Sequence, residues 1–133
     1  MADGVLARLR ALTKRLEGTR EVASWGHPNF RTDARIYCAF HPTRSGEPCI
    51  WIRLDPLAAE LLRGDPRTLA ATHGAAQGWI GVRAGGRIDW RFVGELLHDA
   101  HAASDKKGSK EWRFGKSSAT RPASRSPRTR TRR

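Results

Sequence analysis

The start of the chain places apolar side chains at helical spacing. Val5, Leu9, Leu12 and Leu16 are four, three and four positions apart, so they share one face of a helix. Asp3 has the side chain of an N-cap, and Gly18 follows the last apolar position as a stop signal. The pattern predicts an amphipathic helix between them.

Short apolar runs bounded by loop-forming residues follow this helix. Their β-branched and aromatic residues favour strands. The predicted strands cover residues 21–25, 35–40, 49–54 and 78–83. The segment HPTRSGEP between the second and third of these runs has the composition of a loop.

Two more helices are predicted from cap residues. Asp55 precedes Pro56 and LAAELLR, and Gly64 and Pro66 end this short helix. The segment RTLAAT behind it is interpreted as one further helical turn. Asp89 caps the last helix, whose predicted buried stripe is Phe92, Val93, Leu96, Leu97 and Ala100. The order is helix, three strands, helix, one or two strands, helix.

Charge divides the chain into two parts. The 133 residues carry a net charge of +12, and 11 of the 25 basic but only 2 of the 13 acidic residues fall in 105–133. From residue 115 onward no aromatic residue and no aliphatic residue larger than alanine occurs, so this segment cannot bury enough apolar surface to fold. We expect one folded domain in residues 1–107 and a disordered basic tail in residues 108–133.

The remaining composition bears on the compartment of the protein. No secretory segment and no apolar run of about 20 residues is visible, so we expect a cytoplasmic protein that does not enter a membrane. Cys38 and Cys49 lie in apolar strand-like runs. In a reducing compartment they are expected to be small core residues and not a disulfide.

The densest cluster of unusual residues is SWGHPNFR, residues 24–31. Gly26 permits a tight turn, and Pro28 fixes its own φ and disfavours helix at His27. We interpret the block as a turn between two strands, with Trp25 and Phe30 packing at its ends. The alternative is a functional rim beside the sheet, formed by Trp25, His27 and Arg31.

Several motifs together resemble the MmcQ/YjbR family. They are SWGHPNFRTDARIYCAF, LDPLAAELL, GWIGV and RIDWRFVGELLHDAH, and the resemblance covers about residues 5–107. It implies an α+β domain with an antiparallel sheet and helices mainly on one face, similar to secretion-chaperone and frataxin-like folds. Family members are described as DNA-binding proteins with a double-wing motif, and no catalytic residue transfers. The chain departs from the family pattern at two places. Arg35 stands where the family usually has lysine, and DAHAAS stands where a Ser-Tyr pair is common in the last helix of the family.

Strand alternation suggests what the open face of such a sheet would carry. If the aliphatic side chains face the helices, the other face collects three aromatic and three basic residues. These are Tyr37, Trp51, Trp79, Arg35, Arg53 and Arg83. Aromatic residues beside arginines bind nucleic acid on open sheets. The same face could instead be covered by the arginine stems or form a homodimer interface.

The resulting hypothesis is a nucleic-acid-binding protein, with DNA as the expected ligand and the tail adding sequence-independent phosphate affinity. The predicted contact residues are Arg31, Arg35, Tyr37, Trp51, Arg53, Trp79, Arg83, Lys106, Lys107, Lys110 and Arg113. The alternative is a protein-interaction or chaperone-like module that binds a peptide or a second copy on the same face. A weaker alternative is a domain that binds a small ligand or a metal.

Catalysis and metal binding find little support in the sequence. His27, Cys38, His41, Cys49 and His73 have none of the usual metal-ligand spacings, and His98 and His101 are expected on a solvated helix face. There is no nucleophile motif, and RAGGR is too short for a phosphate-binding loop. We therefore expect no enzyme, no cofactor and no metal.

Overall fold

An antiparallel sheet of six strands organises the chain. The computed structural model describes residues 2–105, so the predicted tail lies outside the described residues. The elements in chain order are α1 (Ala2–Lys14), β1 (Arg20–Ser24), β2 (His27–Arg31), β3 (Ile36–Phe40), β4 (Cys49–Arg53), α2 (Pro56–Leu61), β5 (Thr68–Ala70), η1 (Ala75–Gln77), β6 (Trp79–Arg83) and α3 (Trp90–Asp105). The strand order across the sheet is β1-β2-β3-β4-β6-β5.

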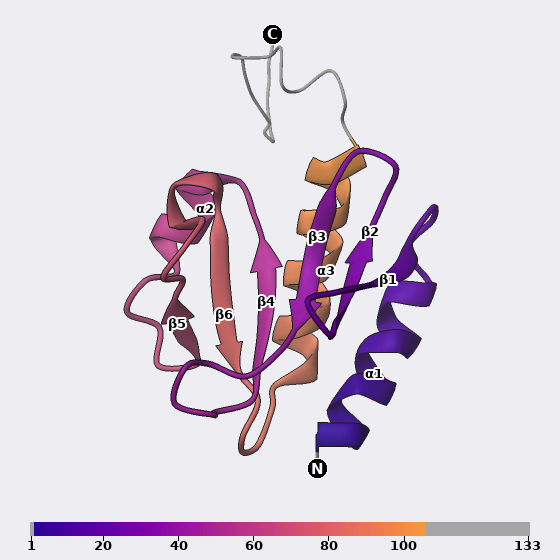
Figure 1. Ribbon diagram of the computed structural model, residues 1–133. Coiled ribbons are helices and arrows are strands. Elements are labelled where there is room, and N and C mark those ends of the chain that lie inside the picture. Colours follow the sequence, from indigo (N-terminus) through magenta and orange to yellow (C-terminus); the bar gives the residue numbers. More distant parts are fainter. Residues whose placement is uncertain (1, 106–133) are drawn as a thin grey trace, which may run out of the picture.

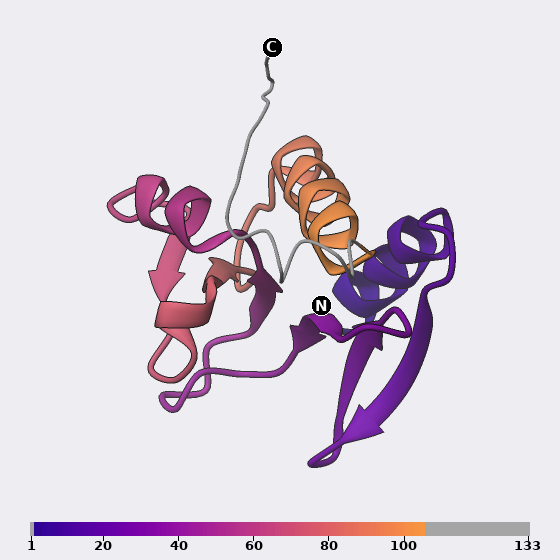
Figure 2. The same ribbon diagram turned by 90° about the horizontal axis from the view of Figure 1, so that it is seen from above.

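The helices α1 and α3 cover one face of this sheet, and α2 lies beside β6 (Figures 1 and 2). The predicted α+β fold class is therefore confirmed. Along the central strands Cys38 pairs with Ile52, and Ile52 pairs with Ile80, so these side chains lie on one face. All three are buried in the core, together with Leu9 of α1 and Leu97 of α3. Within residues 2–105 no α-helix covers the opposite face, and the short helix η1 lies at its edge.

Most predicted elements are confirmed, with ends shifted by a residue or two. The helix α1 begins at Ala2, so Asp3 lies in its first turn and is not its cap. The interpretation of RTLAAT as a helical turn was wrong, because Thr68–Ala70 forms the edge strand β5. Two strands, β5 and β6, therefore lie between α2 and α3, and no further strand follows β6 within residues 2–105.

The block SWGHPNFR combines a turn and a strand. Trp25 and Gly26 form the two-residue loop of a hairpin, because Ser24 of β1 pairs with His27 of β2. The predicted turn is therefore confirmed at Trp25 and Gly26. The residues after it form β2, so four strands and not the predicted three precede α2. The predicted packing is confirmed for Phe30, which is buried, and was wrong for Trp25, which is 95% exposed.

The predicted helix caps at Asp55 and Asp89 are confirmed. The Asp55 carboxylate accepts hydrogen bonds from the backbone N–H groups of Leu57 and Ala58. Asp89 accepts one from the N–H of Phe92 at 3.1 Å. Such bonds satisfy backbone donors that the first turn of a helix leaves free.

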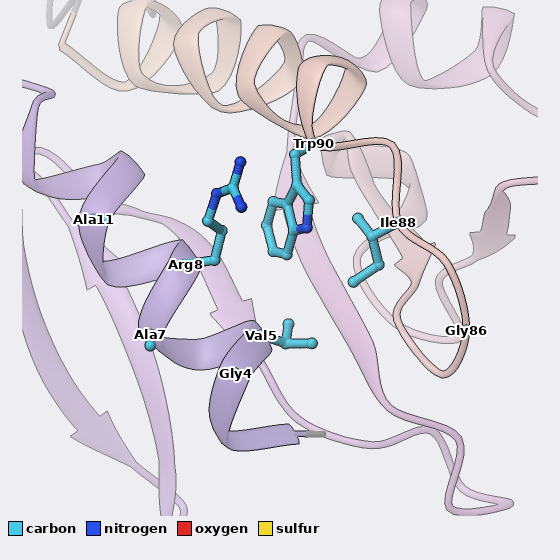
Figure 3. A pocket seen from close by; sticks show the side chains of 8 residues that line it. All are labelled: Gly4, Val5, Ala7, Arg8, Ala11, Gly86, Ile88 and Trp90. Atoms are coloured by element: carbon cyan, nitrogen blue, oxygen red, sulfur yellow. The ribbon is translucent and has the colours of Figure 1, made fainter.

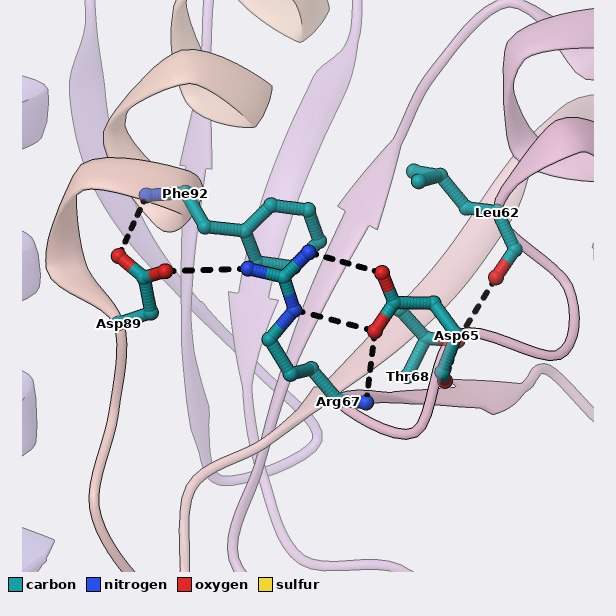
Figure 4. Close-up of polar contacts among 6 residues, drawn as sticks. All are labelled: Leu62, Asp65, Arg67, Thr68, Asp89 and Phe92. Atoms are coloured by element: carbon teal, nitrogen blue, oxygen red, sulfur yellow. Dashed lines mark hydrogen bonds and ion pairs between the residues drawn. The ribbon is translucent and has the colours of Figure 1, made fainter.

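Asp89 also belongs to a polar network that fastens the edge strand to α3 (Figure 4). The Arg67 guanidinium, just before β5, contacts both Asp65 and Asp89 and lies 3.7 Å from the ring centroid of Phe92. Hydrogen bonds from Arg67 lower the pKa of Asp65 to about 2. The strand β5 is thus held to the helical layer as well as to β6.

Candidate functional site

The uncovered face of the sheet is hollowed into a groove of about 920 Å³. Side chains of β3, β4, β5 and β6 form its floor. The loops between β3 and β4 and between β5 and β6 supply its walls. The lining residues are Asn29, Ile36, Ala39, His41, Pro42, Thr43, Arg44, Ser45, Glu47, Trp51, Leu69, Ala70, Ala71, Thr72, His73, Gly74, Gln77 and Trp79.

Trp51 lies half-buried near the middle of the floor. Its indole N–H donates a hydrogen bond to the backbone oxygen of His41 at 3.1 Å, and the His41 ring stacks on it at 5.5 Å between centroids. Trp51 pairs with Gly81 of β6, where a Cβ atom would lie 2.9 Å from the indole Cζ3. The absent side chain therefore lets the indole lie close to the sheet.

A second indole, Trp79, is half-buried at the start of β6. It pairs with Arg53 of β4, so both side chains lie on the groove face of the sheet. Trp51 and Trp79 are thus two aromatic surfaces in one groove, on neighbouring strands. Both were predicted from strand alternation, and the structure brings them together.

Tyr37 was predicted on the same face, and the structure corrects this. Between β2 and β3 the register shifts by one residue, because Phe30 pairs with Cys38 but Arg31 pairs with Ile36. Tyr37 is the extra residue of this bulge, and its side chain is fully buried on the helix side. Its hydroxyl forms a 2.7 Å hydrogen bond with Thr19, and its ring meets His101 of α3 edge-on. Ile36, and not Tyr37, therefore lines the groove.

The position of Tyr37 can be tested by titration, because it is the chain's one tyrosine. Burial raises its pKa to about 12, from about 10 in an unfolded chain. We expect tyrosinate absorbance to appear with a midpoint near pH 12. Because the folded pKa is raised, this contribution to stability is complete below about pH 10 and is lost as the pH rises toward 12. A midpoint near 10 while circular dichroism still reports folded protein would contradict the bulge.

The predicted arginines differ in their surroundings. Arg53 donates from Nε to the backbone oxygen of Gln77, a groove residue, at 3.2 Å, so it borders the groove. Arg31 donates to the backbone oxygens of Thr32 and Asp33, and Arg83 pairs with Glu47. These last two guanidinium groups are already engaged by neighbouring residues.

Arg35 precedes β3 and does not line the groove. Its Nε atom is buried and has no hydrogen-bond partner in residues 2–105. Burial lowers its pKa, and the nearby charge of Arg53 lowers it further. Burial also lowers the pKa of Arg53. The two cations therefore lie near each other at the end of the sheet where β3 begins and β4 ends.

Three polar groove residues were missed by the sequence reasoning. Arg44 and His41 lie in the loop after β3, and His73 lies in the loop after β5. The HPTRSGEP composition predicted a loop but not its position over the sheet face. Because RTLAAT was interpreted as helix, the loop after β5 that forms the second wall was not predicted. The predicted contacts Lys106, Lys107, Lys110 and Arg113 lie outside the described residues.

A smaller hollow of about 450 Å³ lies between α1 and the start of α3 (Figure 3). There the Arg8 guanidinium is 5.2 Å from the ring centroid of Trp90, with Val5 and Ile88 beside them. Arg8 therefore already covers the exposed aromatic ring of this hollow. The groove on the open face has a larger volume and two indoles on its floor, so it is the stronger candidate binding site.

Within residues 2–105 neither the thiols nor the metal-ligating side chains form a second candidate site. Cys38 and Cys49 are free and buried, and burial raises the pKa of both, that of Cys49 to about 12. They are core residues, as expected. No three His, Cys, Asp or Glu side chains of this part of the chain gather in a way that could hold a metal ion.

None of the helices in residues 2–105 combines the length and apolar character needed to span a membrane.

Comparison with known proteins supports the fold alone. No family model matches the chain, and no curated protein sequence matches it. Among solved structures, a Pseudomonas syringae protein from a structural genomics consortium is similar, with a TM-score of 0.63 and 16% identity. The match covers 74% of this chain and 97% of that one. The α+β architecture is thus shared with a solved protein, and membership of the MmcQ/YjbR family stays a prediction.

Proposed function

We propose that the open-face groove binds nucleic acid, with bases stacking on Trp79 and on the stacked rings of His41 and Trp51. The observation that carries the proposal is the presence of two partly exposed indoles on one groove floor, one of them stacked with His41. Stacking on an aromatic side chain contributes about 1–3 kcal/mol per base and tolerates any sequence. The Trp51 indole is held by its hydrogen bond to the His41 backbone and by the His41 ring, so it loses little conformational entropy on binding.

Charge around the floor supports the same ligand. Arg44 lies in one wall and Arg53 borders the other side, where phosphates next to a stacked base could reach them. Glu47 is the one acidic side chain among the described lining residues, and Arg83 neutralises it at 3.1 Å. The basic residues of 108–133 would add affinity without sequence preference.

The shape of the groove favours unpaired bases. Trp79 and the stacked rings of His41 and Trp51 lie between two loops, so only a base whose ring face is free can lie flat on them. Bases in a duplex stack on each other and do not present that face. We therefore place single-stranded nucleic acid, or an unpaired segment, in the groove.

The proposal is tested by anisotropy of a labelled single-stranded oligothymidylate of roughly 15 nucleotides with the full chain. Trp51→Ala and Trp79→Ala should each raise Kd about 5- to 150-fold. Arg53→Ala should weaken binding and reduce the slope of log K against log[salt] by about 0.7. Trp51→Phe should retain most of the affinity because it keeps a ring.

The matched control is Leu61→Ala, which removes an exposed apolar side chain of α2 that does not line the groove. A second control replaces Arg121, Arg125, Arg128, Arg130, Arg132 and Arg133 by serine in the full chain. If this variant loses all binding while the tryptophan variants lose none, the tail alone binds and the groove proposal fails. Sedimentation of each variant shows whether the groove is instead an interface between copies, in which case Trp79→Ala would shift the protein toward monomer.

A further inference from the structure

The tip of the β1–β2 hairpin carries the most exposed large apolar side chain of residues 2–105. Trp25 is 95% exposed and has φ +57°, and the following Gly26 has φ +79°. Two residues with positive φ in a two-residue hairpin loop form a type I′ turn. Trp25 is the single residue other than glycine with positive φ in the described part of the chain.

Folding does not account for tryptophan at this position. The left-handed backbone conformation favours Asn, Asp or Gly, and a side chain branched into a large ring is disfavoured there. An indole that is 95% exposed gains almost no packing within the molecule to offset this cost. The hairpin therefore carries its tryptophan at the expense of stability, which is typical of a residue that contacts a partner.

The hairpin connects to the groove through a series of rings. The ring of His27, two positions after Trp25, lies 5.1 Å from the ring of His41. His41 in turn stacks on Trp51 at 5.5 Å, centroid to centroid. Figure 2 shows the hairpin extending from the sheet on the side away from α1 and α3. Aromatic surfaces thus lead from the groove floor toward the hairpin.

The neighbours of Trp25 indicate the kind of partner. Along the chain Trp25 is flanked by Ala23, Ser24, Gly26 and His27, which are small or polar and offer no second large apolar side chain. An anchor for a protein partner needs a ring of surrounding contacts that exclude water. Base stacking needs only one free aromatic face.

We propose that Trp25 stacks on an unpaired base of a single-stranded nucleic acid where the strand leaves the groove across the hairpin. This inference rests on the function proposed for the groove. Trp25 adds a stacking site outside the groove, so a longer oligonucleotide gains affinity from it and a short one does not.

The test replaces Trp25 by asparagine, which suits the left-handed conformation, in the full chain. Trp25→Asn should raise the melting temperature by about 2–5 °C, because the turn loses its strain. The same variant should bind the oligothymidylate of roughly 15 nucleotides at least about fivefold more weakly. Trp25→Phe should recover most of the affinity without the gain in melting temperature.

The outcomes separate this inference from the function of the groove. If Trp51→Ala abolishes binding and Trp25→Asn leaves the Kd unchanged, the groove proposal stands and the role of Trp25 is overturned. If the wild-type protein does not bind the oligonucleotide, both fail. If the wild-type protein self-associates and Trp25→Asn makes it monomeric, the tip anchors a second copy and the inference is likewise overturned.

Discussion

Replacing Gly78 by alanine is expected to lower the free energy of unfolding by about 3–5 kcal/mol. A Cβ atom at this position would lie 1.8 Å from the backbone oxygen of Leu54 and 2.8 Å from its carbonyl carbon. Backbone atoms cannot rotate away as a side chain does, and φ is +102° at Gly78. The N–H of Leu54 also donates to the oxygen of Gly78 at 2.8 Å, so moving the two segments apart breaks this bond.

The matched control for Gly78→Ala is Gly64→Ala. Gly64 has φ +90°, but a Cβ there would meet no atom within 4 Å. Both variants place alanine in the left-handed region, so the control should lose only about 1 kcal/mol. Urea unfolding of both variants measures the difference. Equal midpoints would show that the approach of Gly78 to Leu54 does not constrain the fold.

Replacing Gly81 by alanine should displace side chains on the floor of the groove. Its Cβ would lie 2.6 Å from the Cys49 sulfur and 2.9 Å from Cζ3 of Trp51. Both side chains must shift, and we expect a loss of about 1–3 kcal/mol in the free energy of unfolding. Because Trp51 moves from its place over β6, oligonucleotide binding should weaken as well.

Urea unfolding and oligonucleotide anisotropy measure the two effects of Gly81→Ala together. Combining it with Cys49→Ala removes one of the two clashes, so the double variant should lose less stability than the sum of the single losses. Gly86→Ala, where a Cβ would meet nothing within 4 Å, is the control for alanine alone. Additive losses would show that Gly81 and Cys49 do not crowd each other.

The sequence predicted the elements whose apolar pattern is strong. The last helix is an example, because Val93, Leu97 and Ala100 repeat at helical spacing and are all buried. The edge strand β5 was missed because three residues are too short for an alternating pattern to appear, and alanine and leucine favour helix. Its pairing with β6 is a contact between segments, which local propensity does not contain.

The candidate site was predicted only in part, because local patterns do not contain the contacts between segments. Strand alternation placed Trp51 and Trp79 on one face correctly, since β4 and β6 pair in regular register. It misplaced Tyr37, because one bulge residue in β3 reverses the alternation before Cys38. The walls depend on where loops fold over the sheet, and HPTRSGEP carries no periodic signal for that.

The network around Arg67 connects the edge strand β5, on the outer side of the groove, to α3 in the helical layer. The strand β5, which carries Leu69 into the groove, is only three residues long and would fray if it were held by β6 alone. Arg67 fastens its beginning to Asp89, the same carboxylate that starts α3. The β5 side of the groove is consequently tied to α3, and a ligand that pulls this side outward would also stretch the ion pair between Arg67 and Asp89.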